Sequence, residues 1–319
     1  MDNHIAKHSS TSDGDTYPRG DLLATARWLK TQKEKKELVI ADVRPDSVFD
    51  GTVIPGAIRL PWNTFTYNDK DLGIGGAFVG IEKAKKILGE NGVSRNNTIV
   101  LYDAVENDGG ATSSYVFWVL DLLGHPNKKV LERGINGWIE AGGPVTSEPG
   151  KRTATLYQAL PEEVKLPVRR AGEDFILARL GDQLTRIIDV RSPEEYTGAK
   201  PDMGLDGRPL KPGHIPGAIN IDYRLNWTDT NTKQLKSCEE LRELYQAIDP
   251  GMTVILYCHS GRRASFTYFA LKMLGFKDVI IYDHSWNVWG NWKSSYPVET
   301  GVAPPKNDNP LRDPTRRGL

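Results

Sequence analysis

Cysteine is scarce in this sequence, since only Cys238 and Cys258 occur among 319 residues. Two cysteines cannot build the disulfide framework of a small secreted domain, and they cannot form a cysteine-rich metal site. The sequence therefore favours a reducing compartment, and we expect the protein to be cytoplasmic.

An excess of charge of one sign is also missing, because 41 Lys and Arg residues balance 41 Asp and Glu residues. Such a chain has no general electrostatic attraction for nucleic acid or for an anionic membrane. No apolar run approaches the roughly 20 residues that span a bilayer. Residues 1–21 contain several acids and no apolar centre, which argues against a secretory signal or a transit peptide. We therefore expect no nucleic-acid partner and no membrane partner.

Internal repeats decide how the chain is organised. Five motifs occur twice in the same order. The number of residues between the two copies varies from motif to motif, as expected if loops of unequal length lie between the motifs. One chance match would mean little, but five in register indicate a duplication into two domains, each large enough to own a core. The paired motifs are 38–44 with 186–191, 54–58 with 215–219, 98–102 with 253–257, 123–124 with 274–275, and Trp138 with Trp289.

The repeats also predict the domain boundaries. A Gly- and Pro-rich surface loop between Gly198 and His214 accounts for most of the first increase in the distance between copies. The segment that contains Pro149-Gly150 shows little apolar periodicity at first and suits a linker. We expect an N-terminal tail over 1–20, a first domain over 21–148, a linker over 149–170, a second domain over 171–300 and a C-terminal tail over 301–319.

Each copy shows the pattern of an α/β fold. Residues 187–190 and 253–257 are short apolar runs without polar alternation, as expected for parallel strands buried on both faces. Strands that alternate with helices predict, in each domain, an open and mostly parallel sheet with helices on both faces. Functional sites of such sheets lie at the carboxyl ends of the strands.

Three helix starts are expected in the second copy. Ser192 and Ser237 can cap helices whose Glu195 and Glu240 complete capping boxes. A third helix should follow Cys258, with Gly275 as its stop.

The most informative segment is the loop that begins at Cys258, between a buried strand and a helix. Backbone N–H groups of such a loop can point at one centre, where the helix N-terminus favours an anion. His259, Arg262 and Arg263 lie within a few residues and, with the helix end, favour the thiolate form of the cysteine. Gly261 lets the loop turn where a side chain would obstruct it. The sequence therefore predicts an anion-binding cup with a nucleophile at its base.

Together, these motifs resemble the rhodanese family over nearly the whole chain. The resemblance rests on Asp189-Val-Arg191, on residues 213–219, on the C-x-x-G-x-R loop from Cys258 to Arg263 and on the aromatic segment 285–289. It implies two tandem rhodanese-like domains and a ping-pong sulfur transfer. The thiolate takes the outer sulfur of a small anionic donor, commonly thiosulfate, and the persulfide passes it to cyanide or a thiol. This chemistry needs no metal and no organic cofactor.

The first copy departs from this pattern. Asp103 replaces the cysteine, and the following residues 104–114 carry acids where the second copy has arginines. A carboxylate cannot form a persulfide, and acids would repel an anion. In two-domain sulfurtransferases the N-terminal domain is typically inactive, so the resemblance implies a catalytically inactive first domain.

The residues around the cysteine receive different roles. We expect Cys258 to be catalytic and at least one arginine to contact the donor, whereas Cys238 suits a buried apolar position. Asp189 and Arg191 are expected to support the domain through ion pairs, and Trp286, Trp289 and Trp292 to pack in the core or at the domain interface. The expected substrate-binding residues are Arg262, Arg263, His259, Ser260 and Gly261.

Three alternatives stay open. Cysteine phosphatases and arsenate reductases resemble C-x5-R, whereas Arg263 stands at C-x4-R and position 264 is alanine. 3-Mercaptopyruvate sulfurtransferases resemble this chain in repeat and fold, but their loops typically end in neutral residues. Two cations suit compact, doubly charged thiosulfate better than a carboxylate donor, which favours thiosulfate. The third alternative is a sulfur-relay or sensing module that acts on a protein partner.

Overall fold

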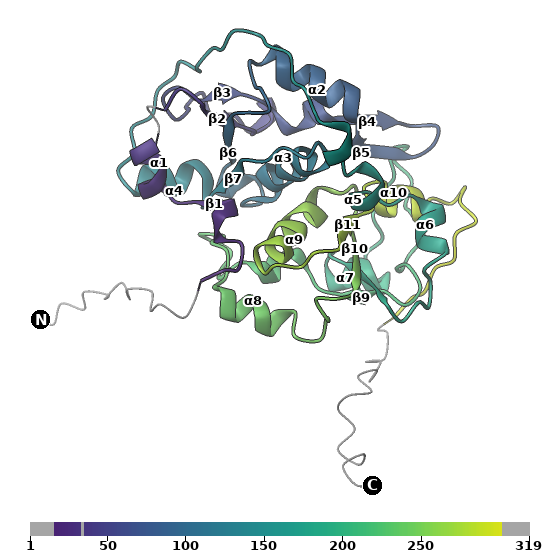
Figure 1. Ribbon diagram of the computed structural model, residues 1–319. Helices are drawn as coiled ribbons and strands as arrows, with labels where there is room; N and C mark the ends of the chain where they lie inside the picture. Colours follow the sequence, from purple (N-terminus) through teal and green to yellow (C-terminus); the bar gives the residue numbers. More distant parts are fainter. Residues whose placement is uncertain (1–15, 33–34, 302–319) are drawn as a thin grey trace, which may run out of the picture.

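The computed structural model describes residues 16–32 and 35–301 and shows two α/β domains, the first above the second in Figure 1. Most of the two expected tails lies outside the described residues. The main sheet of each domain is wholly parallel, which confirms the predicted fold class. No helix in the described part of the chain is long and apolar enough to cross a membrane.

The first domain is built on a five-stranded sheet in the order β1–β7–β6–β2–β3. Ile99 and Leu101 of β6 join the apolar cluster of α2 and α3, whereas Val100 and Tyr102 join that of α1 and α4. Alternate side chains thus bury both faces of the strand, which explains its unbroken apolar sequence. The strands are β1 (Leu23–Ala24), β2 (Leu38–Asp42), β3 (Ile58–Arg59), β6 (Thr98–Tyr102) and β7 (Lys128–Leu131), and the helices are α1 (Ala26–Gln32), α2 (Ile81–Glu90), α3 (Ala111–Leu122) and α4 (Gly134–Glu140).

The second domain repeats this plan with four strands in the order β11–β10–β8–β9. Helices α8 and α9 share an apolar cluster with one face of the sheet, and α6 and α10 share one with the other. The strands are β8 (Thr185–Asp189), β9 (Ile219–Asn220), β10 (Thr253–Tyr257) and β11 (Val279–Ile281). The helices are α6 (Glu173–Leu177), α7 (Pro193–Thr197), α8 (Cys238–Leu244), α9 (Arg262–Met273) and α10 (Ser285–Trp289), and the short helix α5 (Leu166–Arg169) ends the segment that connects the two domains.

The predicted helix starts are confirmed. In both α7 and α8 the serine hydroxyl accepts the N3 backbone N–H, and the N3 glutamate accepts the serine N–H. These two capping boxes satisfy N–H groups that the helix itself leaves unpaired. Helix α9 ends before Gly275, whose φ of +88° is the left-handed conformation expected of a helix stop.

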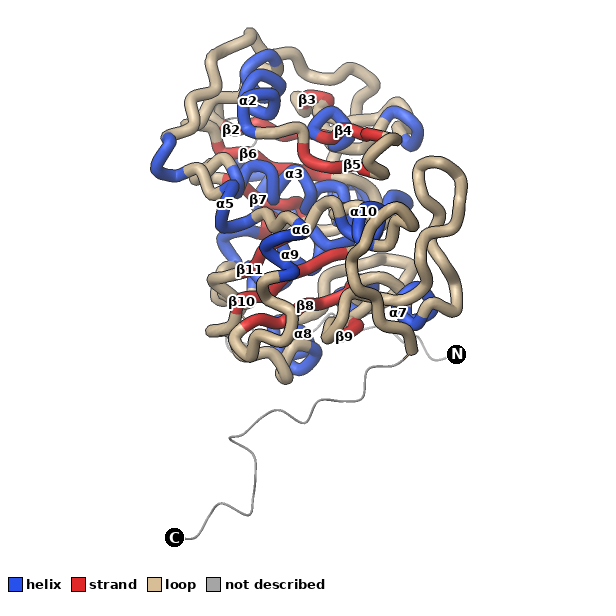
Figure 2. The backbone as a smooth tube through the Cα atoms, turned by 90° about the vertical axis from the view of Figure 1, so that its right-hand side faces the viewer, coloured by secondary structure: helices blue, strands red, loops and turns tan. Residues whose placement is uncertain are grey.

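Helices α3 and α9 join the two domains, and they lie between the two sheets in Figures 1 and 2. Phe117 and Phe269 meet edge to face, with their ring centroids 5.1 Å apart. The Tyr268 hydroxyl donates to Asp121 Oδ2 at 2.5 Å. Because every residue of α3 is buried, one apolar core continues through both domains. Such a core holds the two domains in a fixed relation.

A β-hairpin of the first domain reaches the second domain. Its strands, β4 (Thr66–Asp69) and β5 (Ile74–Phe78), pair antiparallel outside the main sheet. The Phe78 N–H donates to Asp283 Oδ2 at 2.8 Å, and Asn287 Nδ2 donates to the Gly75 carbonyl at 3.3 Å. The hairpin therefore contacts the two segments that lie behind the Cys258 loop.

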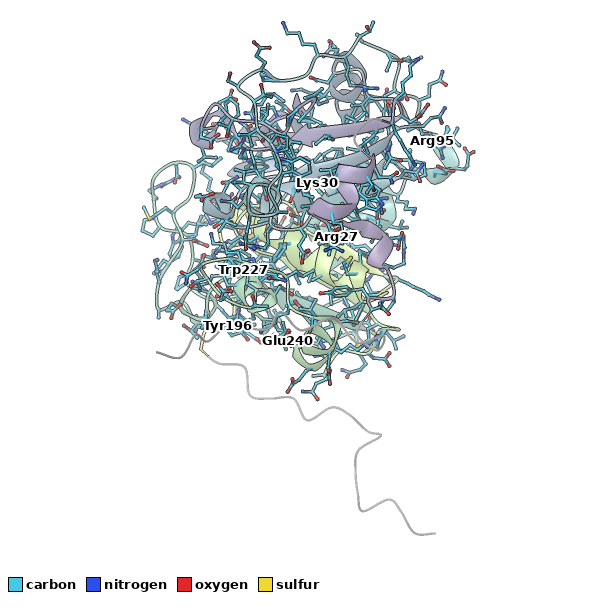
Figure 3. The ribbon with its side chains drawn as sticks, turned by 90° about the vertical axis from the view of Figure 1, so that its left-hand side faces the viewer. Arg27, Lys30, Arg95, Tyr196, Trp227 and Glu240 are labelled. Atoms are coloured by element: carbon cyan, nitrogen blue, oxygen red, sulfur yellow. The ribbon has the colours of Figure 1, made fainter. Side chains whose placement is uncertain are left out.

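The segment between the domains lies along the first domain. The N–H of Gly150 donates to Ala57 O and that of Thr155 to Gly89 O, both at 2.8 Å. Arg95, at the edge of the molecule in Figure 3, pairs with Glu163 just before α5. Several hydrogen bonds thus fix the course of this connection.

The three tryptophans near the end of the second domain do not behave alike. Trp286 and Trp289 of α10 are fully buried, as expected. Trp292 is 62% exposed, so the prediction of a packed position for it was wrong. Helix α10 ends at Trp289, and the three-residue spacing therefore no longer implies a shared face. The Trp292 indole N–H instead donates to the Pro209 carbonyl at 2.7 Å.

Candidate active site

Cys258 follows directly after β10, at the carboxyl end of the second sheet, and its side chain is fully buried. Its backbone N–H donates to Ser285 Oγ at 3.1 Å, and its carbonyl accepts the Trp286 N–H at 3.0 Å. The Gly261 N–H donates to Cys258 Sγ at 3.1 Å. The start of α10 therefore fixes the backbone of the cysteine, while the loop itself donates to its sulfur.

Gly261 makes the tight return of this loop possible. Its φ is +88°, in the left-handed region that disfavours a side chain, and it caps α9. A Cβ there would also lie 3.2 Å from both Cα and Cβ of Asp283. Helix α9 begins at the next residue, and its first N–H groups have no acceptor within the helix. The loop and the helix end can therefore receive an anion beside the sulfur.

The cysteine opens onto a cavity of about 430 Å³. The irregular insertion between Gly198 and His214 supplies one wall through Asp202 and Met203. The other lining residues are Cys258, His259, Ser260, Arg262 and Arg263. All the residues that the sequence placed around the cysteine, except the buried Gly261, thus line one cavity.

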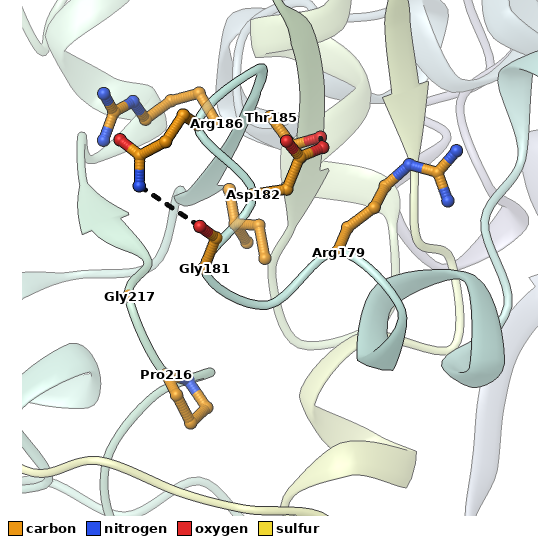
Figure 4. Close-up of a pocket in the computed structure, with 9 residues that line it drawn as sticks. Arg179, Gly181, Asp182, Thr185, Arg186, Pro216 and Gly217 are labelled. Atoms are coloured by element: carbon orange, nitrogen blue, oxygen red, sulfur yellow. Dashed lines mark hydrogen bonds between the residues drawn. The ribbon is translucent and has the colours of Figure 1, made fainter.

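A second and much smaller cavity, of about 40 Å³, lies at the other end of β8 (Figure 4). Arg179, Asp182, Thr185 and Arg186 contribute to its wall, and none of its lining residues is a cysteine or a histidine. Because it lies at the amino end of a parallel strand, it is also at the wrong edge of the sheet for a site of this fold.

Arg263 forms a two-pronged ion pair inside the second domain. Its Nη1 and Nη2 donate to the two carboxylate oxygens of Glu195, both at 2.8 Å. Burial lowers the pKa of Arg263, but the Glu195 hydrogen bonds and the charges of Cys258 and Glu195 raise it by more. Glu195 is itself only 8% exposed and held by the Ser192 capping box. This pair is therefore part of the domain framework.

Arg262 and His259 also face carboxylates. Arg262 Nη2 lies 2.5 Å from Oδ2 of Asp108, which belongs to the first domain. His259 Nδ1 lies 3.0 Å from Asp202 Oδ2, and this contact lowers the pKa of Asp202 despite its burial. Each basic side chain around the cavity thus has an acidic neighbour, and the site carries less net positive charge than the loop sequence implies.

Asp103 occupies the equivalent place in the first domain. Its Oδ2 accepts the N–H groups of Gly110, Thr112 and Ser113 at 3.2, 3.2 and 3.0 Å. Burial raises the pKa of Asp103 to about 6, and these hydrogen bonds hold the rise in check. The sequence suggested that acids here would repel an anion. In the structure the carboxylate itself fills the first-domain cup.

Replacing Asp103 by asparagine should change the free energy of unfolding in a pH-dependent way. The difference, variant minus wild type, should be more favourable to the variant at pH 8 than at pH 4. The folded pKa of about 6 exceeds the ordinary 3.8, so the folded protein binds its proton more tightly. Wild-type stability therefore falls as pH rises from about 4 to 6, by up to about 3 kcal/mol. Neutral asparagine avoids this loss and keeps an oxygen for the cup. Urea unfolding at several pH values measures the difference.

The matched control is Asp206→Asn. A hydrogen bond from Arg208 lowers the pKa of Asp206, which predicts a pH dependence of the opposite sign. If the Asp103→Asn difference is flat between pH 4 and pH 8, the carboxylate is not held in the buried state described above.

Asp189 and Arg191 lie beneath the site as a buried pair. Arg191 Nη2 lies 2.7 Å from Asp189 Oδ2 and donates to the Gly213 carbonyl at 2.7 Å. Its guanidinium is 4.4 Å from the centre of the Trp286 ring. These contacts tie the end of β8 to the loop before β9 and to α10.

Sequence reasoning missed several residues of the site. Glu195 was expected only as a helix cap, and Asp202, Asp108 and Ser285 were assigned no part in it. Their contacts arise from tertiary packing of segments far apart in the chain. The acids of the first copy and of the 198–214 insertion were a signal for Asp108 and Asp202, because buried cations need counter-charges.

Known proteins support the duplication. A family model for the rhodanese-like domain matches residues 25–141 and 174–291. A Mycobacterium bovis protein named putative thiosulfate sulfurtransferase 1 is 34% identical over 289 residues, which are 89% of this chain and 99% of that protein. A Mycobacterium tuberculosis protein named putative thiosulfate sulfurtransferase SseA is 34% identical over 293 residues, covering 90% of this chain and 94% of that protein.

Solved structures of lower identity share the fold. An anaerobic ergothioneine biosynthesis enzyme from Chlorobium limicola, in complex with trimethyl histidine, matches with a TM-score of 0.73 and 22% identity over 91% of this chain and 72% of that chain. Tum1 from Saccharomyces cerevisiae matches with a TM-score of 0.70 and 21% identity over 84% of this chain and 94% of that chain. At such identities the likeness speaks for the fold alone.

Proposed function

The chain belongs to the rhodanese family, with two rhodanese-like domains in tandem, and from this premise we propose that it is a thiosulfate sulfurtransferase. Cys258 carries the sulfane sulfur as a persulfide and passes it to cyanide or another thiophilic acceptor. The proposal rests on one observation: a buried Cys258 sulfur that accepts a loop N–H and opens onto a cavity of about 430 Å³.

The reaction has two balanced steps. The Cys258 thiolate attacks the outer sulfur of thiosulfate, a sulfur–sulfur bond to the protein forms, and the bond to the sulfonate sulfur breaks. Sulfite leaves with that electron pair. Cyanide then attacks the outer persulfide sulfur, thiocyanate leaves, and the thiolate is restored. The electron pairs move between sulfur and carbon atoms only, so neither step requires a proton to be removed.

The residues around the sulfur divide the remaining work. The Gly261 N–H and the first N–H groups of α9 stabilise negative charge on the thiolate and the persulfide. His259, Ser260, Arg262 and Arg263 line the cavity that receives the donor. The Asp189–Arg191 pair supports the site from below. We also propose the boundaries 21–148 and 171–300 for the inactive and catalytic domains, joined by 149–170.

A specific observation keeps 3-mercaptopyruvate as a second candidate donor. The carboxylates of Asp108 and Glu195 pair with both arginines, which weakens the advantage of a doubly charged donor. The relatives named as thiosulfate sulfurtransferases favour thiosulfate. The proposed reaction uses the thiol of Cys258, which is not part of a disulfide. A reducing compartment keeps such a thiol available, so we propose a cytoplasmic location with cyanide or a small thiol as the acceptor.

Donor choice can be measured in the half-reaction. Mixing the protein with thiosulfate should release one sulfite per chain and raise the intact mass by one sulfur atom, which cyanide should then remove as thiocyanate. We expect kcat/KM for thiosulfate to exceed that for 3-mercaptopyruvate by about tenfold, equivalent to about 1.4 kcal/mol. A protein that accepts sulfur only from 3-mercaptopyruvate would make that compound the donor and overturn the assignment.

A further inference from the structure

The loop that follows Asp103 is longer than its counterpart in the second domain. Residues 104–110 separate Asp103 from α3, whereas only 259–261 separate Cys258 from α9. Asp108 in this longer loop has a φ of +61°, and the next two glycines also have positive φ. The chain therefore turns sharply at Asp108 and projects toward the other domain.

The second domain clamps this loop in place. Lys233 Nζ donates to the Val105 carbonyl at 2.6 Å, and the Trp227 indole donates to the Gly109 carbonyl at 3.2 Å. A Cβ on Gly109 would lie 2.5 Å from Lys233 Cβ, which shows how closely the two segments approach. Trp227, labelled in Figure 3, belongs to the second domain. Asp108 is thus presented to the catalytic domain in a defined position.

Asp108 meets the arginine that is least committed to the framework. Within the described part of the chain Arg262 forms only this ion pair, and its side chain is 25% exposed. Its Nη1 is buried and has no hydrogen-bond partner among the described residues. The guanidinium also lies 5.6 Å from the centre of the Trp62 ring, another first-domain contact. Arg263, by contrast, is fully engaged by the buried Glu195.

We propose that Asp108 of the inactive domain occupies Arg262 in place of the donor anion and so sets the affinity and charge selectivity for the donor. This inference rests on the proposed sulfur transfer. Both groups that compete for Arg262 are anions, and the cavity that Arg262 lines also contains Cys258. A doubly charged donor must displace the Asp108 carboxylate, whereas Trp62 keeps the guanidinium in place as the carboxylate leaves.

Asp108→Asn tests this competition, because it removes the charge and keeps the size of the side chain. We expect the half-saturating thiosulfate concentration for persulfide formation to fall about three- to tenfold, as for loss of a partly exposed charged contact. The gain for 3-mercaptopyruvate should be smaller, because it carries one carboxylate charge. Raising the salt concentration should narrow the difference between variant and wild type.

Glu106→Gln is the matched control. Glu106 lies two residues away in the same loop and contacts the Asn136 amide instead of the cavity. If both substitutions had the same effect, the change would come from the general charge near the cavity and not from the contact between Asp108 and Arg262. That result would overturn the proposal. Asp108→Asn should also lose its effect when Arg262 is replaced by methionine, and a persisting effect would overturn it.

A second readout separates this inference from the proposed function. Sulfate, which transfers no sulfur, should protect Cys258 from iodoacetamide at lower concentration in Asp108→Asn than in wild type. If that holds while thiosulfate never loads the wild-type protein, the sulfur-donor assignment fails and the Asp108 inference stands. If thiosulfate loads normally but neither half-saturation nor protection changes in Asp108→Asn, the inference fails alone.

Discussion

Cys258→Ser is expected to abolish thiosulfate:cyanide sulfur transfer, with a loss of at least about a thousandfold. A serine hydroxyl is a much weaker nucleophile than a thiolate and cannot store a sulfane sulfur as a persulfide. The substitution is nearly isosteric, and the Gly261 N–H that now donates to the sulfur can donate to the hydroxyl oxygen. The free energy of unfolding should therefore change by no more than about 1 kcal/mol. Thiocyanate production and urea unfolding measure the two effects separately.

Cys238→Ala is the control for this variant. Cys238 is also fully buried but lies at the start of α8, and it is not among the residues that line the cavity. The control should keep wild-type turnover and still gain one sulfur atom in mass after thiosulfate treatment. A sulfur increment that survives in Cys258→Ser, or that maps to the peptide containing Cys238, would contradict the assignment.

The fold could be predicted because its signals are local and occur twice. The apolar run at 253–257 is β10 in the structure, and the run at 187–190 overlaps β8. The Ser192–Glu195 and Ser237–Glu240 spacings each produce a capping box. Such patterns depend on residues within one turn or one strand, so a single sequence contains all that they require.

The position of the cysteine could be predicted for the same reason, but the charges around it could not. The loop sequence contains two arginines and a histidine, which suggested a strongly cationic cup. Their partners Asp108, Glu195 and Asp202 lie 154, 68 and 57 residues away in sequence, and only the packed structure brings them together. Burial makes such partners necessary, but it does not say which acids supply them.

The role of the first domain was the least predictable part. Its sequence showed that Asp103 cannot act as a sulfur nucleophile, and the structure adds that this carboxylate fills its own cup. The β4–β5 hairpin is reduced in the second copy to a single antiparallel bridge between Trp227 and Leu235, and its greater length in the first copy was not expected from the repeat. Its contacts with Asp283 and Asn287 depend on how α3 and α9 set the two domains against each other.

Arg263→Met should both destabilise the protein and reduce its activity, because the Arg263–Glu195 pair is largely buried. Removing one partner of a buried pair leaves an uncompensated charge, and a loss of about 3 kcal/mol in the free energy of unfolding is expected. The carboxylate of Glu195 would keep its capping contact with Ser192 but would lose its cationic partner. Its negative charge would then act unopposed near the Cys258 thiolate and the donor. We expect kcat/KM for thiosulfate to fall about a hundredfold.

Glu195→Gln separates the two effects. It also breaks the pair and should cost a similar amount of stability, but it leaves the cation rather than the anion without its partner. The pKa of Arg263 lies above its ordinary value, partly because of Glu195, and a guanidinium stays charged at neutral pH without that help. Because the charge of Glu195 is removed, the positive charge of Arg263 is no longer offset, and the KM for thiosulfate should stay the same or fall. The KM is measured at a temperature where both variants are fully folded. If the two variants lose kcat/KM equally there, Arg263 and Glu195 act only by supporting the loop, and the charge of Arg263 has no part in receiving the donor.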